Sequence, residues 1–163
     1  MNTKASTDLA STINGITVRQ AVLADLDGLV PLLDQYRQFY KRASDLSAAR
    51  AFLLERFNHG ESVLFIAHEG SVALGFAQLY PSFSSVSLAR VFVFNDLFVA
   101  EAGRRKGIAK RLIEASADYA KSLGAIAMSL STAKNNDDAQ ALYRATGWAR
   151  EETYIEYNLM LGR

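Results

Sequence analysis

GRRKGIAKRLIEASADYAKSLG, residues 103–124, joins three cations to a stretch with the spacing of an amphipathic helix. Apolar side chains recur at helical spacing from 108 to 123, and Gly124 is a residue type that commonly follows a helix end. A helix N-terminus carries partial positive charge and unpaired N–H groups, so acidic residues are usual there. Arg104, Arg105 and Lys106 therefore oppose the helix dipole unless an anion lies among them.

A phosphate or pyrophosphate would satisfy the free amides, the dipole and the cations together. Gly107 would let the backbone approach such an anion closely, because glycine has no Cβ. Neither the P-loop spacing nor the dinucleotide-binding glycine pattern is present. The alternative interpretation is a solvated basic turn, which leaves the conflict with the dipole unexplained.

The composition is that of an ordinary globular protein: 163 residues, half of them hydrophobic, with a net charge of +1. This predicts one compact domain over 1–163, with 1–15 as a flexible lead-in. The near-neutral charge argues against a nucleic-acid partner and against an anionic membrane surface. No apolar run approaches the roughly 20 residues of a membrane span.

Cysteine is absent, which excludes disulfides and a thiolate nucleophile. The two histidines have no partner at metal-ligand spacing, so we expect no metal site. The N-terminus lacks the hydrophobic core of a signal peptide, and we expect a cytoplasmic location by default.

Hydrophobic periodicity predicts the element order β-α-α-β-β-β-α-β-α-β. The expected ranges are 16–21, 25–42, 46–57, 62–69, 71–81, 87–100, 108–123, 125–132, 135–147 and 153–161. This order predicts a mixed α/β fold whose sheet is mainly antiparallel and has six or seven strands. The β-α-β crossover makes 91–99 and 125–131 neighbouring parallel strands.

Two motifs carry a family resemblance. Residues 104–109 fit the loop pattern Q/R-x-x-G-x-G/A, with Ala109 where many members have glycine. Residues 136–148 fit N-x-x-A-x-x-L-Y-x-x-x-G-F/W. Both lie in order on elements that were predicted separately, so the chain over about 16–161 resembles the GNAT N-acetyltransferase superfamily.

The resemblance implies acetyl-CoA as the cofactor, with its pyrophosphate on the amides of the basic loop. It implies that the backbone at Leu97 stabilises the oxyanion and that Tyr143 protonates the leaving thiolate. The cofactor contacts implied are Leu97, Phe98, Val99, Arg104, Arg105, Lys106, Gly107, Ile108, Ala109, Asn136, Ala139 and Tyr143.

The implied function is transfer of an acetyl group to a primary amine by direct attack in a ternary complex. The acceptor is a small or polyamine-like amine, or a lysine side chain, and we allow for a homodimer. The alternative is a non-catalytic CoA-binding regulatory module on the same fold. Tyr143 has a structural alternative too, as a core aromatic on an amphipathic helix.

The acceptor site is expected just before the cofactor-binding strand segment. Asn95 and Asp96 alternate in direction there, so only one of them would face the amine. Asp96 is a candidate base or ammonium anchor, with a purely structural role weighed evenly against it. Tyr36, Tyr40 and Tyr80 are expected to line the same pocket, although two tyrosines on one helix face are more often core residues.

Overall fold

A computed structural model describes residues 11–162. The chain divides into two compact units, one that ends at Ser131 and one that begins at Thr132. We call them the sheet unit and the C-terminal unit.

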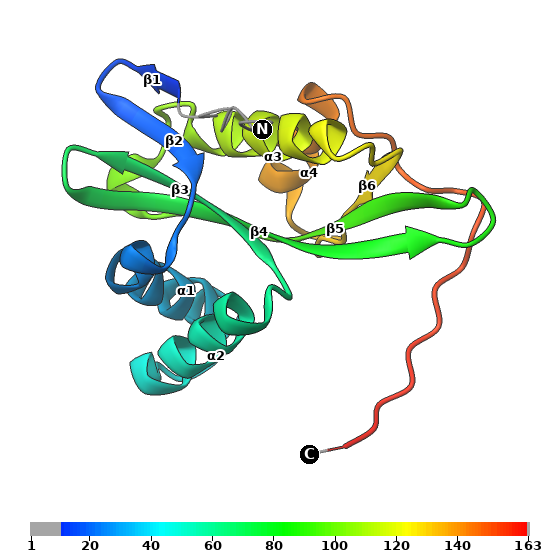
Figure 1. Ribbon diagram of the computed structural model, residues 1–163, viewed down its shortest axis with the longest axis horizontal. Coiled ribbons are helices and arrows are strands. Elements are labelled where there is room, and N and C mark those ends of the chain that lie inside the picture. The colour runs from blue at the N-terminus through cyan, green and yellow to red at the C-terminus, as the bar shows by residue number, and fades with distance from the viewer. Residues whose placement is uncertain (1–10, 163) are drawn as a thin grey trace, which may run out of the picture. The chain divides into compact units, whose positions relative to one another are not determined.

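The sheet unit contains a six-stranded sheet in which the strands follow one another in sequence order (Figure 1). The strands are β1 (Ser11–Ile13), β2 (Ile16–Gln20), β3 (Val63–Glu69), β4 (Val72–Ser84), β5 (Ala89–Val99) and β6 (Ala127–Ser129). All neighbours are antiparallel except β5 and β6, where residues 91–93 run parallel to 127–129. The predicted mixed α/β fold and its parallel strand pair are therefore confirmed.

The first strand was not expected. The sequence predicts a flexible lead-in over 1–15, but β1 pairs with β2 through a tight turn at Asn14 and Gly15. Both turn residues have positive φ, 52° and 78°, which is the backbone that an Asn-Gly hairpin turn requires. The Asn-Gly dipeptide is thus the signal in the sequence that points to this hairpin. Residues 1–10 of the expected lead-in lie outside the described residues.

Helices cover both faces of the sheet (Figure 1). The short helix η1 (Leu23–Asp25) leads into α1 (Leu26–Phe39), and α1 and α2 (Leu46–His59) lie on one face. Their apolar residues form one core with the sheet: Leu26, Leu29, Val30, Leu33, Leu53, Leu64, Ile66 and Phe76. The short helix η2 (Glu101–Gly103) precedes α3 (Ile108–Ser122) on the other face. There the Tyr119 ring packs edge-on against Phe65 and Phe92, with centroids 5.8 and 6.0 Å away.

Local signals fix the ends of α2. The Asp45 side chain accepts a 2.9 Å hydrogen bond from the Ala48 amide at the N-terminus. Gly60 ends the helix with a φ of 61°, the left-handed backbone that favours glycine. None of the helices within residues 11–162 is both long and apolar enough to cross a membrane.

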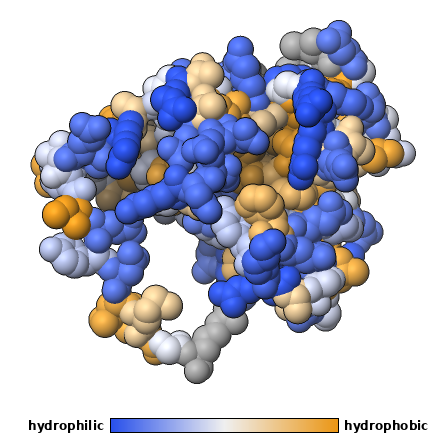
Figure 2. All heavy atoms as spheres, turned by 180° about the vertical axis from the view of Figure 1, so that it is seen from behind, coloured by the Kyte–Doolittle hydropathy of each residue, from blue (hydrophilic) through white to orange (hydrophobic). Residues whose placement is uncertain are grey.

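The C-terminal unit contains α4 (Asp137–Ala145), as predicted, but the strand predicted over 153–161 is wrong. Its alternating pattern is that of a half-buried strand, yet no ladder within the described residues includes it. Ile155, Leu159 and Leu161 are at least 80% exposed. Exposed apolar side chains lie next to the C-terminal end of the chain, at the bottom of Figure 2. An alternation of apolar and polar residues therefore predicts which side chains a strand would bury. A strand forms only where the edge of a neighbouring strand is available for pairing.

Candidate functional site

The basic loop precedes α3, as the sequence predicted. Arg105 and Gly107 both have positive φ, 60° and 75°, so the loop turns sharply before the helix begins. No side chain caps α3, and its first turn has no acidic residue. A Cβ added at Gly107 would meet no protein atom within 4 Å. The start of α3 therefore has no side-chain cap, and the space beside Gly107 is open, which suits an anion.

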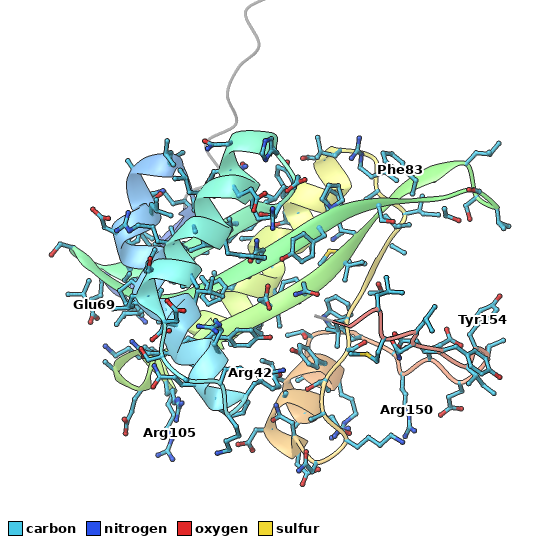
Figure 3. The ribbon with its side chains drawn as sticks, turned by 90° about the horizontal axis from the view of Figure 1, so that it is seen from below. Arg42, Glu69, Phe83, Arg105, Arg150 and Tyr154 are labelled. Carbon is cyan, nitrogen blue, oxygen red and sulfur yellow. The ribbon has the colours of Figure 1, made fainter. Side chains whose placement is uncertain are left out.

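The three cations of this loop have different surroundings. The Lys106 ammonium lies 2.9 Å from a carboxylate oxygen of Glu69 at the end of β3, a partly exposed ion pair. Glu69 and Arg105 lie at the same end of the sheet unit, and Arg105 is directed outward (Figure 3). Arg104 and Arg105 are both exposed. Glu69 thus explains part of the charge that the sequence alone had left without a counter-ion.

The strand before the loop has an open edge. The pairing of β5 with β6 covers only Val91–Val93, whereas its pairing with β4 continues to Val99. Among the described ladders, residues 94–99 therefore have a neighbour on one side only. These residues include Leu97, Phe98 and Val99. Unpaired strand edges accept an extended chain, so this edge can hold the backbone-like arm of a ligand.

A β-bulge interrupts β5 next to this edge. Gln78 of β4 pairs with Asp96, but the next residue, Leu79, pairs with Phe94, which leaves Asn95 without a partner. Simple alternation between Asn95 and Asp96, the basis of the sequence argument, therefore fails here. The exposed Asn95 donates from Nδ2 to Oδ1 of Asp96 across 3.1 Å. The bulge thus brings both candidate residues together.

Asp96 lies in nearly closed surroundings, with 7% of its surface exposed. Tyr36 on α1 interacts electrostatically with Asp96 and also with Tyr40. The Tyr36 and Tyr40 rings meet edge to face, 5.1 Å between centroids, and the Tyr36 ring also packs on Phe76 and Phe98. The helix α1 therefore carries its two tyrosines to the carboxyl of β5.

Electrostatics in this cluster follow from burial. Burial raises the pKa of Asp96, and the hydrogen bonds from Asn95 and Tyr36 only partly oppose it. Burial and then the charge of Asp96 raise the pKa of Tyr36. The same two causes raise the pKa of the half-buried Tyr80 to about 12. The structure thus gathers Tyr36, Tyr40, Tyr80 and Asp96 into one cluster, which favours binding a proton or a cation.

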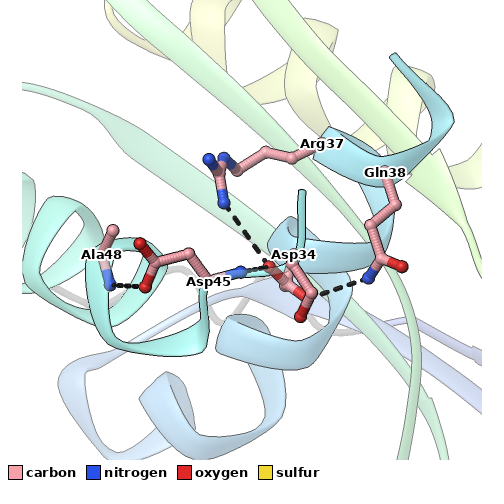
Figure 4. A network of polar contacts seen from close by, with 6 residues as sticks. Asp34, Arg37, Gln38, Asp45 and Ala48 are labelled. Atoms are coloured by element: carbon pink, nitrogen blue, oxygen red, sulfur yellow. Dashed lines mark hydrogen bonds and ion pairs between the residues drawn. The ribbon is translucent and has the colours of Figure 1, made fainter. Parts of the chain in front are cut away.

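A second buried carboxylate, Asp34, was missed in the sequence (Figure 4). It is 3% exposed and lies on α1 one turn after buried Val30. It accepts hydrogen bonds from Ser44 Oγ at 2.7 Å, from the Asp45 amide at 2.7 Å and from Gln38 Nε2 at 2.9 Å. The hydrogen bond from Ser44, then that from Asp45, lowers the pKa of Asp34. A charged residue within the apolar stripe of α1 was the available signal.

The C-terminal unit holds the remaining candidates. Asn136 is the N-cap of α4, and its Oδ1 accepts from the Ala139 amide across 3.2 Å. Tyr143 is half-buried, and its ring packs on Trp148 with centroids 6.0 Å apart. Among the described residues no cluster of three metal-ligating side chains occurs.

Known acetyltransferases are similar to this chain over most of its length. Residues 29–148 match the model of the Acetyltransferase (GNAT) family. The Uncharacterized N-acetyltransferase YhfO of Bacillus subtilis (strain 168) is 44% identical over 144 residues, which cover 88% of this chain and 97% of that protein.

Two solved structures share the fold. A crystal structure of a probable acetyltransferase has a TM-score of 0.85 at 38% identity, covering 90% of this chain and 98% of the other. Aminoglycoside N-acetyltransferase AAC(6')-Iy in complex with CoA has a TM-score of 0.74 at 25% identity, covering 88% of this chain and 94% of that one.

Proposed function

The chain belongs to the acetyltransferase (GNAT) family, and from this premise we propose that it transfers the acetyl group of acetyl-CoA to a primary amine. The similar aminoglycoside acetyltransferase AAC(6')-Iy was solved with CoA, which supports an acyl-CoA as the donor. The acceptor that we favour is a small or polyamine-like amine.

The donor would bind along β5 and the start of α3. The uncapped amides and the open space beside Gly107 support a site for the pyrophosphate at residues 104–109. The open edge of β5 supports pairing of the pantetheine arm with Leu97, Phe98 and Val99. When bound, acetyl-CoA supplies the activated acetyl group as a thioester.

The observation that carries the acceptor proposal is Asp96, a nearly buried carboxyl among tyrosines. Its raised pKa makes it a better base than an exposed aspartate, because a group must hold a proton once it has taken it. The partly exposed rings of Tyr36 and Tyr40 provide an aromatic approach for an amine-bearing chain. An amine could reach Asp96 directly or through one water molecule.

The proton balance of this proposal is complete. The neutral amine attacks the acetyl carbon and gives one proton to Asp96. A backbone N–H near Leu97 stabilises the negative oxygen that develops. The carbon–sulfur bond then breaks, and Tyr143 donates its phenolic proton to the departing thiolate. Bulk water then takes the proton from Asp96 and supplies one to Tyr143, so each group ends in its starting state.

An amine panel assayed for CoA release tests the proposal. We expect an acetylated product with at least one primary amine, identified by mass spectrometry, and none without acetyl-CoA. Polyamines, amino sugars and a lysine-containing peptide should all be present in the panel. Tight CoA binding without turnover of any amine would instead support a regulatory CoA-binding module.

A further inference from the structure

Gln78, near the middle of β4, has a buried polar atom without a partner. The side chain is 0% exposed, and its Nε2 donates to Ser62 Oγ across 2.8 Å. Its Oε1 has no hydrogen-bond partner in the described part of the chain. Buried carbonyl oxygens are nearly always paired, so an unpaired one calls for an explanation.

The register of the sheet places Gln78 directly opposite Asp96. Side chains of directly opposed residues leave the sheet on the same face, with Cβ atoms about 5 Å apart. The next pair on that face is Phe76 and Phe98, against which the Tyr36 ring packs. Gln78 therefore flanks Asp96 on the face that α1 covers.

Asp96 already has donors for its charged form. Asn95 Nδ2 donates to Oδ1 of the carboxylate, and Tyr36 also favours the charged form of Asp96. Once protonated, the carboxyl becomes a donor itself and needs an acceptor. The Tyr36 hydroxyl can donate as well as accept and also interacts with Tyr40, whereas an amide oxygen is an acceptor only.

The titratable and charged groups around Asp96 come from three elements. Tyr36 on α1 and Tyr80 on β4 both interact with Asp96, and Tyr40 on α1 interacts with Tyr36. Arg56 on α2 acts on Tyr80, where its charge opposes the effect of Asp96. Gln78 adds a neutral acceptor to this set, in a position that Asp96 can use only in its protonated form.

We infer that Gln78 is a positioning residue whose Oε1 accepts the hydrogen bond of Asp96 after Asp96 has taken the proton of the attacking amine. Ser62 holds the other end of the amide, which keeps the oxygen available. The inference rests on the proposed function for its role in catalysis. The interaction itself depends only on the protonation of Asp96.

The test is an NMR titration of the Asp96 carboxyl in the full chain, with and without Gln78→Met. A hydrogen bond to the neutral carboxyl raises its pKa, so losing that bond lowers the titration midpoint. We expect a decrease of roughly half a unit to one unit, the equivalent of one neutral hydrogen bond. An unchanged or raised midpoint overturns the inference.

Leu79→Met is the matched control, because Leu79 is also 0% exposed and is the next residue of the same strand. It should leave the Asp96 midpoint unchanged. If Gln78→Met does not fold, Gln78→Glu replaces it: a second carboxylate beside Asp96 should raise the Asp96 midpoint, and no change there also overturns the inference.

Activity separates this inference from the proposed function. The acidic limb of the kcat/KM profile should move down in Gln78→Met by the same amount as the NMR midpoint. A shifted NMR midpoint in a protein that acetylates no amine would support the Gln78 contact and reject the proposed function. A protein that acetylates an amine, but whose Asp96 midpoint is the same in Gln78→Met, would support the proposed function and reject the Gln78 contact.

Discussion

At the scale of single residues, Asp96 combines burial with a charge that its surroundings disfavour. We predict that Asp96→Asn lowers turnover by roughly 10²-fold or more, the usual range for a general base, and removes the acidic limb of the pH profile. Steady-state kinetics between pH 5 and 9 check this, with calorimetry to show that CoA affinity is unchanged. Wild-type kinetics in this variant would make Asp96 structural.

The same residue makes a prediction about stability. A carboxyl whose pKa is raised on folding favours the protonated native state, so its ionisation destabilises the protein as the pH rises above about 4. The Tm of Asp96→Asn relative to wild type should therefore increase between pH 3 and pH 7. Thermal unfolding at several pH values measures it, and a constant difference would contradict it.

Tyr143 is the residue for which a conservative substitution separates catalysis from packing. Tyr143→Phe keeps the ring that packs on Trp148 and removes only the hydroxyl. We expect unchanged CoA affinity and a loss in kcat of roughly 10²-fold. Tyr119→Phe, an aromatic residue of the α3 core, is the control and should retain activity. Equal activity of both variants would leave Tyr143 a packing residue.

At the scale of elements, the turn into α3 depends on Gly107. Valine is strained at a φ of 75°, and its side chain would occupy the space where the anion should lie. We expect Gly107→Val to raise the Kd for CoA about tenfold or more. Gly124→Val is the control, because Gly124 has a φ of 73° and equally open surroundings at the other end of α3. If both variants bind CoA alike, the pyrophosphate site lies elsewhere.

The connection from α1 to α2 depends on Asp34, which lies on the same helix as Tyr36 and Tyr40 and bonds to Ser44 and Asp45. We predict that Asp34→Ala costs about 2–3 kcal/mol of stability, as expected for hydrogen bonds to a charged group. It should also raise the amine KM, with CoA affinity unchanged, because the two tyrosines lose their support.

The control for Asp34 is Asp27→Ala on the same helix. Asp27 is an exposed partner of Arg50, and surface ion pairs contribute little. Its variant should resemble wild type in both the unfolding free energy and the amine KM. If Asp34→Ala keeps the wild-type stability and amine KM, the hydrogen bonds of Asp34 neither stabilise the fold nor support the two tyrosines.

At the scale of the whole molecule, buried and paired carboxylates set the response to acid. Arg19 pairs with Asp25 at 2.6 Å, and its hydrogen bond lowers the pKa of that carboxyl; the pKa of Asp34 is lowered as well. Each contributes stability above its unfolded pKa, and this is lost as the pH falls below about 4. Asp96 acts in the opposite direction.

We therefore expect the unfolding free energy to fall on acidification from pH 5 to pH 3, because Asp25 and Asp34 lose the stabilisation of their charged forms as they take up protons. Denaturant unfolding across this range measures the slope. Replacing both Asp25 and Asp34 by Asn should flatten or reverse it. A wild-type protein that gains stability on acidification would contradict this account.

The sequence alone determined the helices, the antiparallel order of the strands and the parallel crossover. These follow from side-chain periodicity, which each segment carries in itself. It also predicted the turn into α3, because Gly107 and the cations lie in one short stretch. The four residues expected around the amine were likewise named from the chemistry of their side chains.

Only the tertiary structure decided the features in which a residue needs a partner from a distant part of the chain. It set the bulge that leaves Asn95 unpaired, the position of Gln78 opposite Asp96 and the pairing of Lys106 with Glu69. It also left 153–161 without a strand partner among the described ladders, despite its alternating sequence. Periodicity tells which face of a segment is apolar, but register and ion pairing arise only when another segment supplies the opposing hydrogen bonds and charges.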